Sequence, residues 1–257
     1  MSEIHSTALI DPSAQIGNNV TIGANTIIEA DTIIGDNANI GANCLVASYT
    51  ELGSGVSLFH GAVLGTIPQD LKFEGEKTRL VIGDNTTIRE YAMLNRGTVD
   101  RGETIIGKNC LLMAYSHVAH DCLIGENVIM ANSVNLAGHV EIGEYAIIGG
   151  VVPVHQFVKI GAHSMIGGGF RVQQDICPFS LVGGYPLKVA GLNSLGLRRR
   201  GFERETIRML EAAYKILFFS SLNTSQAVEK IKAEIEPVEE IQLILDFIKS
   251  SKRGMVK

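Results

Sequence analysis

The sequence has no tryptophan and few aromatic or charged residues. Aromatic side chains make up 6% of its 257 residues and charged side chains 19%, so large rings cannot fill its core. Hydrophobic residues nevertheless reach 46%, and glycine, with 28 residues, is more frequent than in an average globular protein. This combination predicts many thin, repeated layers filled by Ile, Val and Ala.

The sequence also lacks the marks of several functional classes. Its net charge of -5 gives no reason to expect nucleic-acid binding. The first residues do not resemble a signal peptide, and the longest uncharged stretch, residues 145–158, contains Pro153 and is too short to span a bilayer. Without metal-site spacing, free thiols in a reducing compartment are expected at Cys44, Cys110, Cys122 and Cys177. We therefore expect a cytoplasmic protein without membrane insertion.

What the sequence does contain is a six-residue repeat. An aliphatic residue or Met recurs at every sixth position, and a small or β-branched residue usually follows four positions later. A period of six does not supply the three-to-four spacing of an α-helix. The repeated positions are Ile4, Ile10, Ile16, Ile22, Ile28, Ile34, Ile40, Val46, Leu52, Leu58, Leu64, Ile82, Ile88, Leu94, Ile106, Leu112, Val118, Ile124, Met130, Leu136, Ile142, Ile148, Val154, Ile160, Ile166 and Val172.

A repeat of six has a physical explanation in a parallel β-solenoid. Each hexad forms a short strand with one inward aliphatic side chain and then turns a corner. Gly or Asn supplies the permissive backbone dihedrals of that corner, with glycine often directly after the aliphatic residue, as at Gly17 and Gly23. Three hexads make one triangular coil, and successive coils stack about 4.8 Å apart.

The repeat is interrupted twice, between Leu64 and Ile82 and between Leu94 and Ile106. Both interruptions are multiples of six residues, so the chain leaves the coil and returns to the same face. We expect extruded loops at about residues 65–79 and 96–104. Loops on a regular scaffold are natural places for function.

The hexads stop after Pro178, and the pattern becomes helical from about Phe202. A second helix is expected to start at Thr224 or Ser225 and a third near Pro237. Helices at this place would cover the exposed strand edge at the end of the solenoid. The predicted domains are a β-helix over residues 1–190 and an α-helical domain over residues 191–257.

Histidines cluster in the second half of the repeat, at His117, His120, His139 and His155. Because one coil consists of three hexads, His139 should stack on Asp121, and Gly138 on His120, where glycine would leave open space for a substrate. A neutral imidazole is suited to removing a proton from a hydroxyl group. Whether Asp121 orients His120 stays open, because adjacent residues on a strand point in opposite directions.

Other interpretations of these residues compete. In one interpretation, the histidines are ordinary polar corner residues. In another, they are zinc ligands, because a class of zinc carbonic anhydrases shares this repeat. The spacing of His117 and His120 does not match that class, so we expect no metal. The basic run at residues 198–200, with Arg204 and Arg208, is either a solvated helix start or a binding patch for phosphates and an acidic carrier protein.

Several interruptions of the repeat occur together and in a characteristic order. They are Gln69-Asp70-Leu71-Lys72-Phe73, Arg96-Gly97-Thr98, His117-Val118-Ala119-His120-Asp121, Leu136-Ala137-Gly138-His139, Val154-His155-Gln156-Phe157 and Arg199-Arg200-Gly201-Phe202. With these motifs the chain resembles the UDP-N-acetylglucosamine acyltransferase family over essentially its whole length.

The resemblance implies a left-handed parallel β-helix, a homotrimer, and an enzyme without metal or cofactor. It implies transfer of a 3-hydroxyacyl chain from acyl carrier protein to the glucosamine 3-hydroxyl of UDP-N-acetylglucosamine, the first step of lipid A biosynthesis. The acceptor group, hydroxyl or amine, is left open. The other interpretations are a related N-acyltransferase, whose extra N-terminal domain has no room before Ile4, and a non-enzymatic scaffold.

The resemblance also implies roles for individual residues. His120 is the expected general base, and the Gly138 amide the expected oxyanion donor. Substrate contacts are expected from Gln69, Asp70, Lys72, His117, Asp121, His139, His155, Gln156, Asn193 and Arg199, and an acyl pocket at Gly168 and Pro186. Three positions depart from a known relative, namely Asn95, Leu195 and Pro186. Gly168 leaves the pocket unblocked, which favours a long acyl chain.

Overall fold

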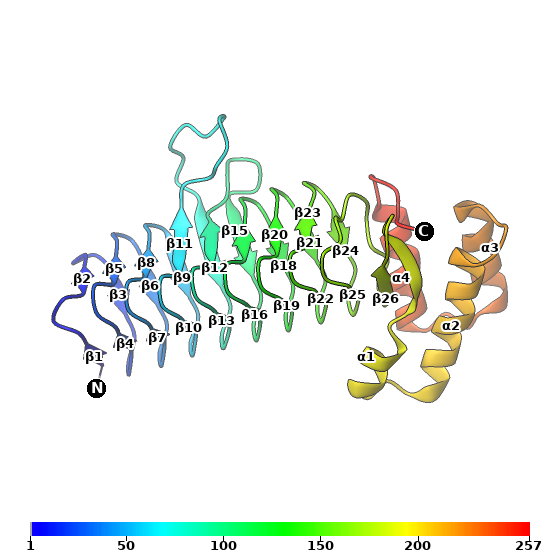
Figure 1. The fold of residues 1–257 in the computed structure, drawn as a ribbon, viewed down its shortest axis with the longest axis horizontal. Coiled ribbons are helices and arrows are strands. Elements are labelled where there is room, and N and C mark those ends of the chain that lie inside the picture. The colour runs from blue at the N-terminus through cyan, green and yellow to red at the C-terminus, as the bar shows by residue number, and fades with distance from the viewer. Residues whose placement is uncertain (1) are drawn as a thin grey trace.

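The computed structural model describes residues 2–257, and most of them form a left-handed parallel β-helix (Figure 1). Short strands stack into three parallel sheets that form the faces of a triangular prism. Four helices lie at its C-terminal end. The predicted fold class is confirmed.

Up to β25 the three sheets take the strands in rotation, every third strand belonging to the same sheet, and β26 and β27 then extend sheet A. Sheet A contains β1 (Glu3–Ile4), β4 (Thr21–Ile22), β7 (Asn39–Ile40), β10 (Ser57–Leu58), β13 (Thr87–Ile88), β16 (Leu111–Leu112), β19 (Ile129–Met130), β22 (Ile147–Ile148), β25 (Met165–Ile166), β26 (Ser180–Gly183) and β27 (Lys188–Leu192). Sheet B contains β2 (Leu9–Ile10), β5 (Ile27–Ile28), β8 (Leu45–Val46), β11 (Val63–Thr66), β14 (Met93–Asn95), β17 (His117–Val118), β20 (Asn135–Leu136) and β23 (Pro153–Val154). Sheet C contains β3 (Gln15–Ile16), β6 (Ile33–Ile34), β9 (Thr50–Leu52), β12 (Arg79–Ile82), β15 (Glu103–Ile106), β18 (Leu123–Ile124), β21 (Glu141–Ile142) and β24 (Lys159–Ile160).

The register follows the repeat read from the sequence. In the regular coils each residue pairs with the one 18 positions later, as Ile22 does with Ile40. Where the repeat is interrupted, the partner lies 30 positions away, as for Leu58 and Ile88, or 24 away, as for Ile88 and Leu112. The inserted chain, two hexads in the first case and one in the second, leaves the prism as a loop. The aliphatic positions therefore keep pointing into the core.

At the corners of the coils, asparagine and the glycines directly after the aliphatic residue have different roles. Positive φ angles recur three positions after the aliphatic residue, often at asparagine, as at Asn19 (54°) and Asn43 (56°). The glycines directly after the aliphatic residue are needed for another reason. A Cβ added to Gly35 would lie 2.6 Å from the backbone of Gly53 in the next coil. The expectation that Gly or Asn supplies the corner dihedrals is confirmed for asparagine, and for Gly55 (67°) and Gly61 (71°), but was wrong for the glycines directly after the aliphatic residue, which allow close stacking of coils.

Both loops leave the prism at the same edge. They follow strands of sheet B and precede strands of sheet C, and we call this the B–C edge. The large loop (residues 67–78) joins β11 to β12, and the small loop (residues 96–102) joins β14 to β15. Figure 1 shows both projecting from the same side of neighbouring coils. Later corners of this edge carry His120, His139 and Phe157.

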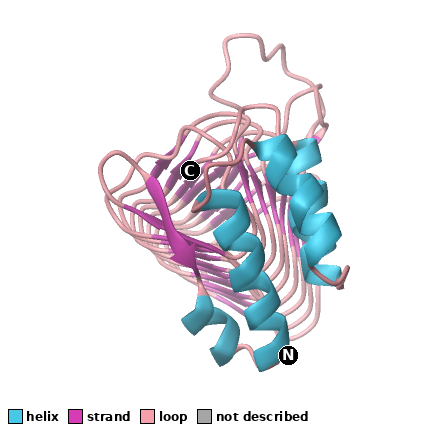
Figure 2. Ribbon diagram, turned by 90° about the vertical axis from the view of Figure 1, so that its right-hand side faces the viewer, coloured by secondary structure: helices cyan, strands magenta, loops and turns pink. Residues whose placement is uncertain are grey.

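The C-terminal segment continues sheet A and then becomes helical. β27 pairs antiparallel with β26, and the helices that follow lie across the end of the prism (Figure 2). They are α1 (Ser194–Arg199), α2 (Arg204–Phe218), α3 (Thr224–Glu234) and α4 (Glu239–Ser250). The expected starts of the last two helices are confirmed, whereas α1, a single short helix capped by Asn193, was not expected. No helix within residues 2–257 is both long and apolar enough to cross a membrane.

Candidate functional site

His120 and Asp121 occupy the corner between β17 and β18, on the B–C edge. Nδ1 of His120 lies 2.8 Å from Oδ2 of Asp121. The two side chains meet because they belong to a corner and not to a strand: Asp121 has a φ of 60°. The alternation expected of a strand does not apply there, which resolves the question that the sequence left open.

The carboxylate of Asp121 is completely buried and fully engaged by its neighbours. The backbone N–H of Thr98 donates to Oδ1 (2.9 Å), and the Thr98 hydroxyl donates to Oδ2 (2.6 Å). Burial works to raise the pKa of Asp121, but the hydrogen bonds from Thr98 and His120 outweigh it and hold the pKa below its usual range. Asp121 is therefore ionised, and Nδ1 of His120 carries the proton of the hydrogen bond between them.

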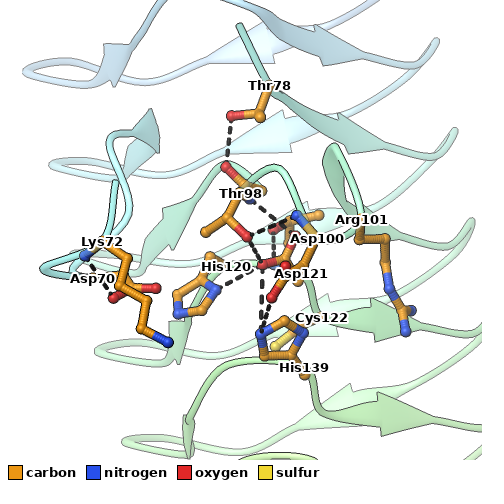
Figure 3. A network of polar contacts seen from close by, with 12 residues as sticks. Asp70, Lys72, Thr78, Thr98, Asp100, Arg101, His120, Asp121, Cys122 and His139 are labelled. Atoms are coloured by element: carbon orange, nitrogen blue, oxygen red, sulfur yellow. Dashed lines mark hydrogen bonds and ion pairs between the residues drawn. The ribbon is translucent and has the colours of Figure 1, made fainter. Parts of the chain in front are cut away.

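His139 stacks on this pair, as the length of the coil predicted. Its backbone N–H donates to the carbonyl oxygen of His120 (3.0 Å), and its Nε2 lies 3.7 Å from Oδ2 of Asp121. The His139 ring meets the His120 ring edge to face and stacks on Phe157 at a centroid distance of 4.5 Å. Figure 3 shows both imidazoles converging on the carboxylate of Asp121.

Gly138 lies beside His120, but the space left by its missing side chain is not empty. A Cβ at this position would approach Cε1 of His120 to 2.6 Å and Nε2 to 2.8 Å. The expectation that glycine leaves room for a substrate was wrong, because the His120 ring itself fills that room. Within residues 2–257 the N–H of Gly138 donates to no acceptor, and Nε2 of His120 has no hydrogen-bond partner.

The large loop carries Gln69, Asp70 and Lys72. Its turn is formed locally, since the N–H of Lys72 donates to Oδ1 of Asp70 (3.0 Å). The side chain of Gln69 reaches Sδ of Met93 in β14, at 3.9 Å. In Figure 3, Asp70 and Lys72 lie on the side of the His120 ring away from Arg101.

The other expected histidines are near this site but make separate contacts. His117, in β17, has its Nδ1 3.2 Å from the carbonyl oxygen of Met93. Burial lowers the pKa of His117 and this hydrogen bond opposes the shift, so the ring is neutral at pH 7. His155 contacts the carbonyl oxygen of its neighbour Gln156, and the two line a shallow hollow with Arg171.

The remaining candidate residues lie elsewhere in the single chain. Gly168 follows β25 at the edge between sheets A and B, stacked on Gly150, and Pro186 lies in the exposed turn between β26 and β27. Asn193 caps α1 and donates to the carbonyl oxygen of His163 (2.9 Å). Arg199 is exposed on α1.

The basic run expected near the helices is divided by the fold. Arg198 and Arg199 are exposed, as are Arg204 and Arg208 on α2. Arg200 turns inward instead, donates to the carbonyl oxygen of Tyr145 (2.6 Å) and lies over the Tyr145 ring. The run therefore leaves four exposed arginines on α1 and α2, one of which, Arg208, pairs with Glu205 at 3.3 Å, and Arg200 anchors the helices to the prism.

The structure holds one arrangement that invites a metal interpretation. Ligand atoms of His120, Asp121 and His139 lie within 4.8 Å of one another. However, Asp121 already accepts three hydrogen bonds, and a cation would have to displace the Nδ1 proton of His120. Because both oxygens of Asp121 and Nδ1 of His120 are already hydrogen-bonded, the arrangement fits a hydrogen-bonded His–Asp pair better than a metal site.

Sequence reasoning missed the small loop's share of this site. Thr98 provides both hydrogen bonds that the loop gives to Asp121, and the Asp100 carboxylate lies 3.8 Å from Nε2 of His139. Arg101 pairs with Glu141 in the sheet C strand β21 at 2.9 Å. The available signal was the interruption of the repeat at this loop, since nothing in the spacing says where an irregular loop places its side chains.

Comparison with known proteins identifies the class of this fold and site. A sequence profile described as "Bacterial transferase hexapeptide (six repeats)" matches residues 13–48 and 103–138. One described as "Udp N-acetylglucosamine O-acyltransferase; Domain 2" matches residues 175–256. The chain is thus a hexapeptide-repeat transferase with the C-terminal domain of one particular family.

Full-length relatives define that family. An acyl-[acyl-carrier-protein]–UDP-N-acetylglucosamine O-acyltransferase from Aquifex aeolicus is 59% identical, covering 99% of this chain and 98% of its own. The corresponding protein of Chlorobium phaeobacteroides is 60% identical, covering 99% and 97%. Solved UDP-N-acetylglucosamine acyltransferases superpose closely: that of Bacteroides fragilis has a TM-score of 0.97, 46% identity and coverages of 98% and 99%. The chain belongs to the UDP-N-acetylglucosamine O-acyltransferase family and is an acyltransferase.

Proposed function

We propose that this acyltransferase moves a 3-hydroxyacyl chain from acyl carrier protein to the glucosamine 3-hydroxyl of UDP-N-acetylglucosamine, as the first step of lipid A biosynthesis in the cytoplasm. The names of its full-length relatives support both substrates. The observation that carries the mechanism is the hydrogen bond between His120 Nδ1 and the buried carboxylate of Asp121, which leaves Nε2 without a partner.

His120 acts as general base in this proposal. The carboxylate of Asp121 holds the proton on Nδ1, so Nε2 presents a lone pair to the acceptor hydroxyl. Nε2 takes the hydroxyl proton as the sugar oxygen forms a bond to the thioester carbon. The carbon–sulfur bond then breaks, and the proton passes from Nε2 to the departing thiol of the carrier protein.

The charge that develops on the thioester oxygen needs a donor in place beforehand. The free N–H of Gly138 lies next to the His120 ring and supports this role. The imidazolium that forms on His120 is stabilised by Asp121, while the neutral His117 and the His139 ring border the same corner.

The substrates would meet the residues at the edges of the prism. Lys72 on the large loop and the exposed Arg199 provide cations for the phosphates of the nucleotide, and the exposed arginines of α1 and α2 suit an acidic carrier protein. Gly168 and Asn193 lie at other edges of the same chain than His120. A site that uses all of them needs a second copy, which supports the homotrimer.

Purified protein incubated with UDP-N-acetylglucosamine and a panel of 3-hydroxyacyl carrier proteins tests the proposal, with products identified by mass spectrometry. We expect one acylated sugar nucleotide, and a loss of about 10²-fold or more in kcat for His120→Ala. His60→Ala, an exposed corner histidine on another edge, serves as the control. No product with any donor would reject the reaction, and full activity of His120→Ala would reject the base.

A further inference from the structure

Four consecutive residues contact both the large loop and the corner that carries His120 and Asp121. Residues 95–98, Asn-Arg-Gly-Thr, end β14 and begin the small loop, and we call them the connecting segment. We propose that the connecting segment is a positioning element, which holds the large loop with Lys72 at one side and the carboxylate of Asp121 at the other. The roles of Lys72 and Asp121 rest on the proposed function.

Asn95 and Gly97, the first and third residues of the connecting segment, hold the two ends of the large loop. Nδ2 of the buried Asn95 donates to the carbonyl oxygen of Ile67 (2.9 Å), where the loop begins. The carbonyl oxygen of Gly97 accepts from the hydroxyl of Thr78 (2.5 Å), where the loop ends. A Cβ at Gly97 would lie 2.5 Å from the backbone of Glu103, so the backbone of the connecting segment packs closely against Glu103 at this point.

Arg96 holds the middle of the large loop. Its guanidinium lies over two rings, with its carbon 5.5 Å from the ring centre of Phe73 and 5.3 Å from that of Tyr49. Phe73 adjoins Lys72 on the loop, whereas Tyr49 belongs to the preceding coil of the prism. Arg96 therefore fastens the tip of the loop to the scaffold beside the residue proposed to bind phosphate.

The surroundings of Arg96 do not explain it as a stabilising residue. Only 9% of the residue is exposed, and its Nε has no hydrogen-bond partner within residues 2–257. The polar contact that its guanidinium makes, to the carbonyl oxygen of Ser48, is a long one of 3.4 Å. A buried cation without a carboxylate partner is costly, so an apolar side chain of similar length would suit the fold as well or better.

Thr98 completes the segment on the catalytic side. Thr98 donates two hydrogen bonds to Asp121, and it directly follows Gly97, which accepts a hydrogen bond from the end of the large loop. Thr98 therefore holds the carboxylate that orients His120 by bonds of its own, separate from those that Asn95 and Gly97 make to the large loop. The segment acts through Lys72 and Asp121, and its own side chains need not touch a substrate.

The test replaces Arg96 by Met, which keeps the length and apolar contacts and removes the charge. We expect KM for UDP-N-acetylglucosamine to rise about tenfold with kcat within threefold of wild type, and no fall in the midpoint of thermal unfolding. Arg89→Met is the matched control: Arg89 also lies over a ring, that of Phe59 at 4.3 Å, but on another edge. It should keep wild-type KM.

A second measurement does not depend on activity. Trypsin cleaves after Lys72 and Lys77, both exposed on the large loop, and Arg96→Met should speed this cleavage about tenfold by freeing the loop. Arg89→Met should be cleaved at the wild-type rate. Faster cleavage in a protein that makes no product would reject the proposed function and support the segment's role in holding the loop.

Two results would overturn the proposal. One is unchanged cleavage and unchanged KM in Arg96→Met. The other comes from combining Arg96→Met with Lys72→Ala. If Arg96 acts through Lys72, the double variant has the KM of Lys72→Ala alone, whereas independent effects would multiply.

Discussion

A side chain at position 138 and the imidazole of His120 exclude each other, since a Cβ on Gly138 would lie 2.6 Å from Cε1 of His120. The backbone does not demand glycine there: Ala24, Ala42 and Ala114 occupy the same position of the hexad in other coils. It is the histidine ring that requires glycine at this point, and so the residue before His139 is coupled to the orientation of the His120 ring.

Gly138→Ala should lower kcat/KM by about 10²-fold, because even a displacement of about 1 Å takes His120, the proposed base, out of line with the acceptor hydroxyl. Steady-state assays of the variant, beside thermal unfolding, measure the effect. Ala114→Gly changes the same hexad position on another edge and should keep its activity. Activity within threefold of wild type in Gly138→Ala would show that the His120 ring is not held there during the reaction.

Thr98→Val removes the shorter of the two hydrogen bonds from Thr98 to Asp121 and leaves the shape of the side chain. We expect kcat to fall about tenfold, since a hydrogen bond to a charged group is worth about 1.5–3 kcal/mol. Thr98→Ser keeps the hydroxyl and should restore kcat to near the wild-type value. A wild-type kcat in Thr98→Val would show that the hydroxyl bond to Asp121 does not contribute to the reaction.

His163 makes the stability of the fold depend on pH. It is stacked between Tyr145 and Phe179, and burial, with a smaller contribution from the charge of Arg200, lowers its pKa to about 4. The unfolded chain takes up this proton near pH 6.5, so stability falls as pH drops from about 6.5 towards 4. This one group accounts for up to roughly 3 kcal/mol.

His163→Phe should make the pH dependence shallower over that interval. Phe fits the stack and the positive φ of 58°, an angle that Phe157 (63°) and Phe179 (69°) also adopt. Denaturant unfolding of both proteins at pH 7 and pH 5 measures the difference. Parallel curves for variant and wild type would contradict a neutral, buried His163.

Chelation separates the hydrogen-bonded base from a metal site. The grouping of His120, Asp121 and His139 is compact enough for a cation, yet Asp121 and Nδ1 of His120 are already bonded to each other. We expect dialysis against a strong chelator to leave kcat unchanged, and elemental analysis to find no metal at the molar amount of the chain. Loss of activity that added zinc restores would reverse the assignment of His120 as a free base.

Most of the fold could be predicted from the six-residue period, because each coil repeats the same geometry. Once three hexads make one coil, the sequence alone predicts that His139 stacks on Asp121, and the two residues are in contact. Interruptions by whole hexads likewise preserve the inward face. Regular backbone turns a distance in sequence into a position in space.

The rest of the candidate site depended on backbone that departs from the repeat. The contact between His120 and Asp121 follows from a left-handed φ at the corner, which a strand-based argument could not anticipate. The role of Thr98 follows from the path of the small loop. Gly138 was singled out correctly for its position, but the neighbour that requires it is a ring of the protein itself.

The rotation of the strands through three sheets has a consequence for how the length of this protein can change. Adding one whole coil between Ile22 and Ile40 would lengthen the prism by about 4.8 Å and leave each later corner on its own edge. Winding in a single hexad would instead turn every later corner by one face, and the loops would point away from any neighbour that met the B–C edge. Inserting whole coils therefore leaves the geometry of the candidate site unchanged, whereas inserting a single hexad moves the site to another edge of the prism.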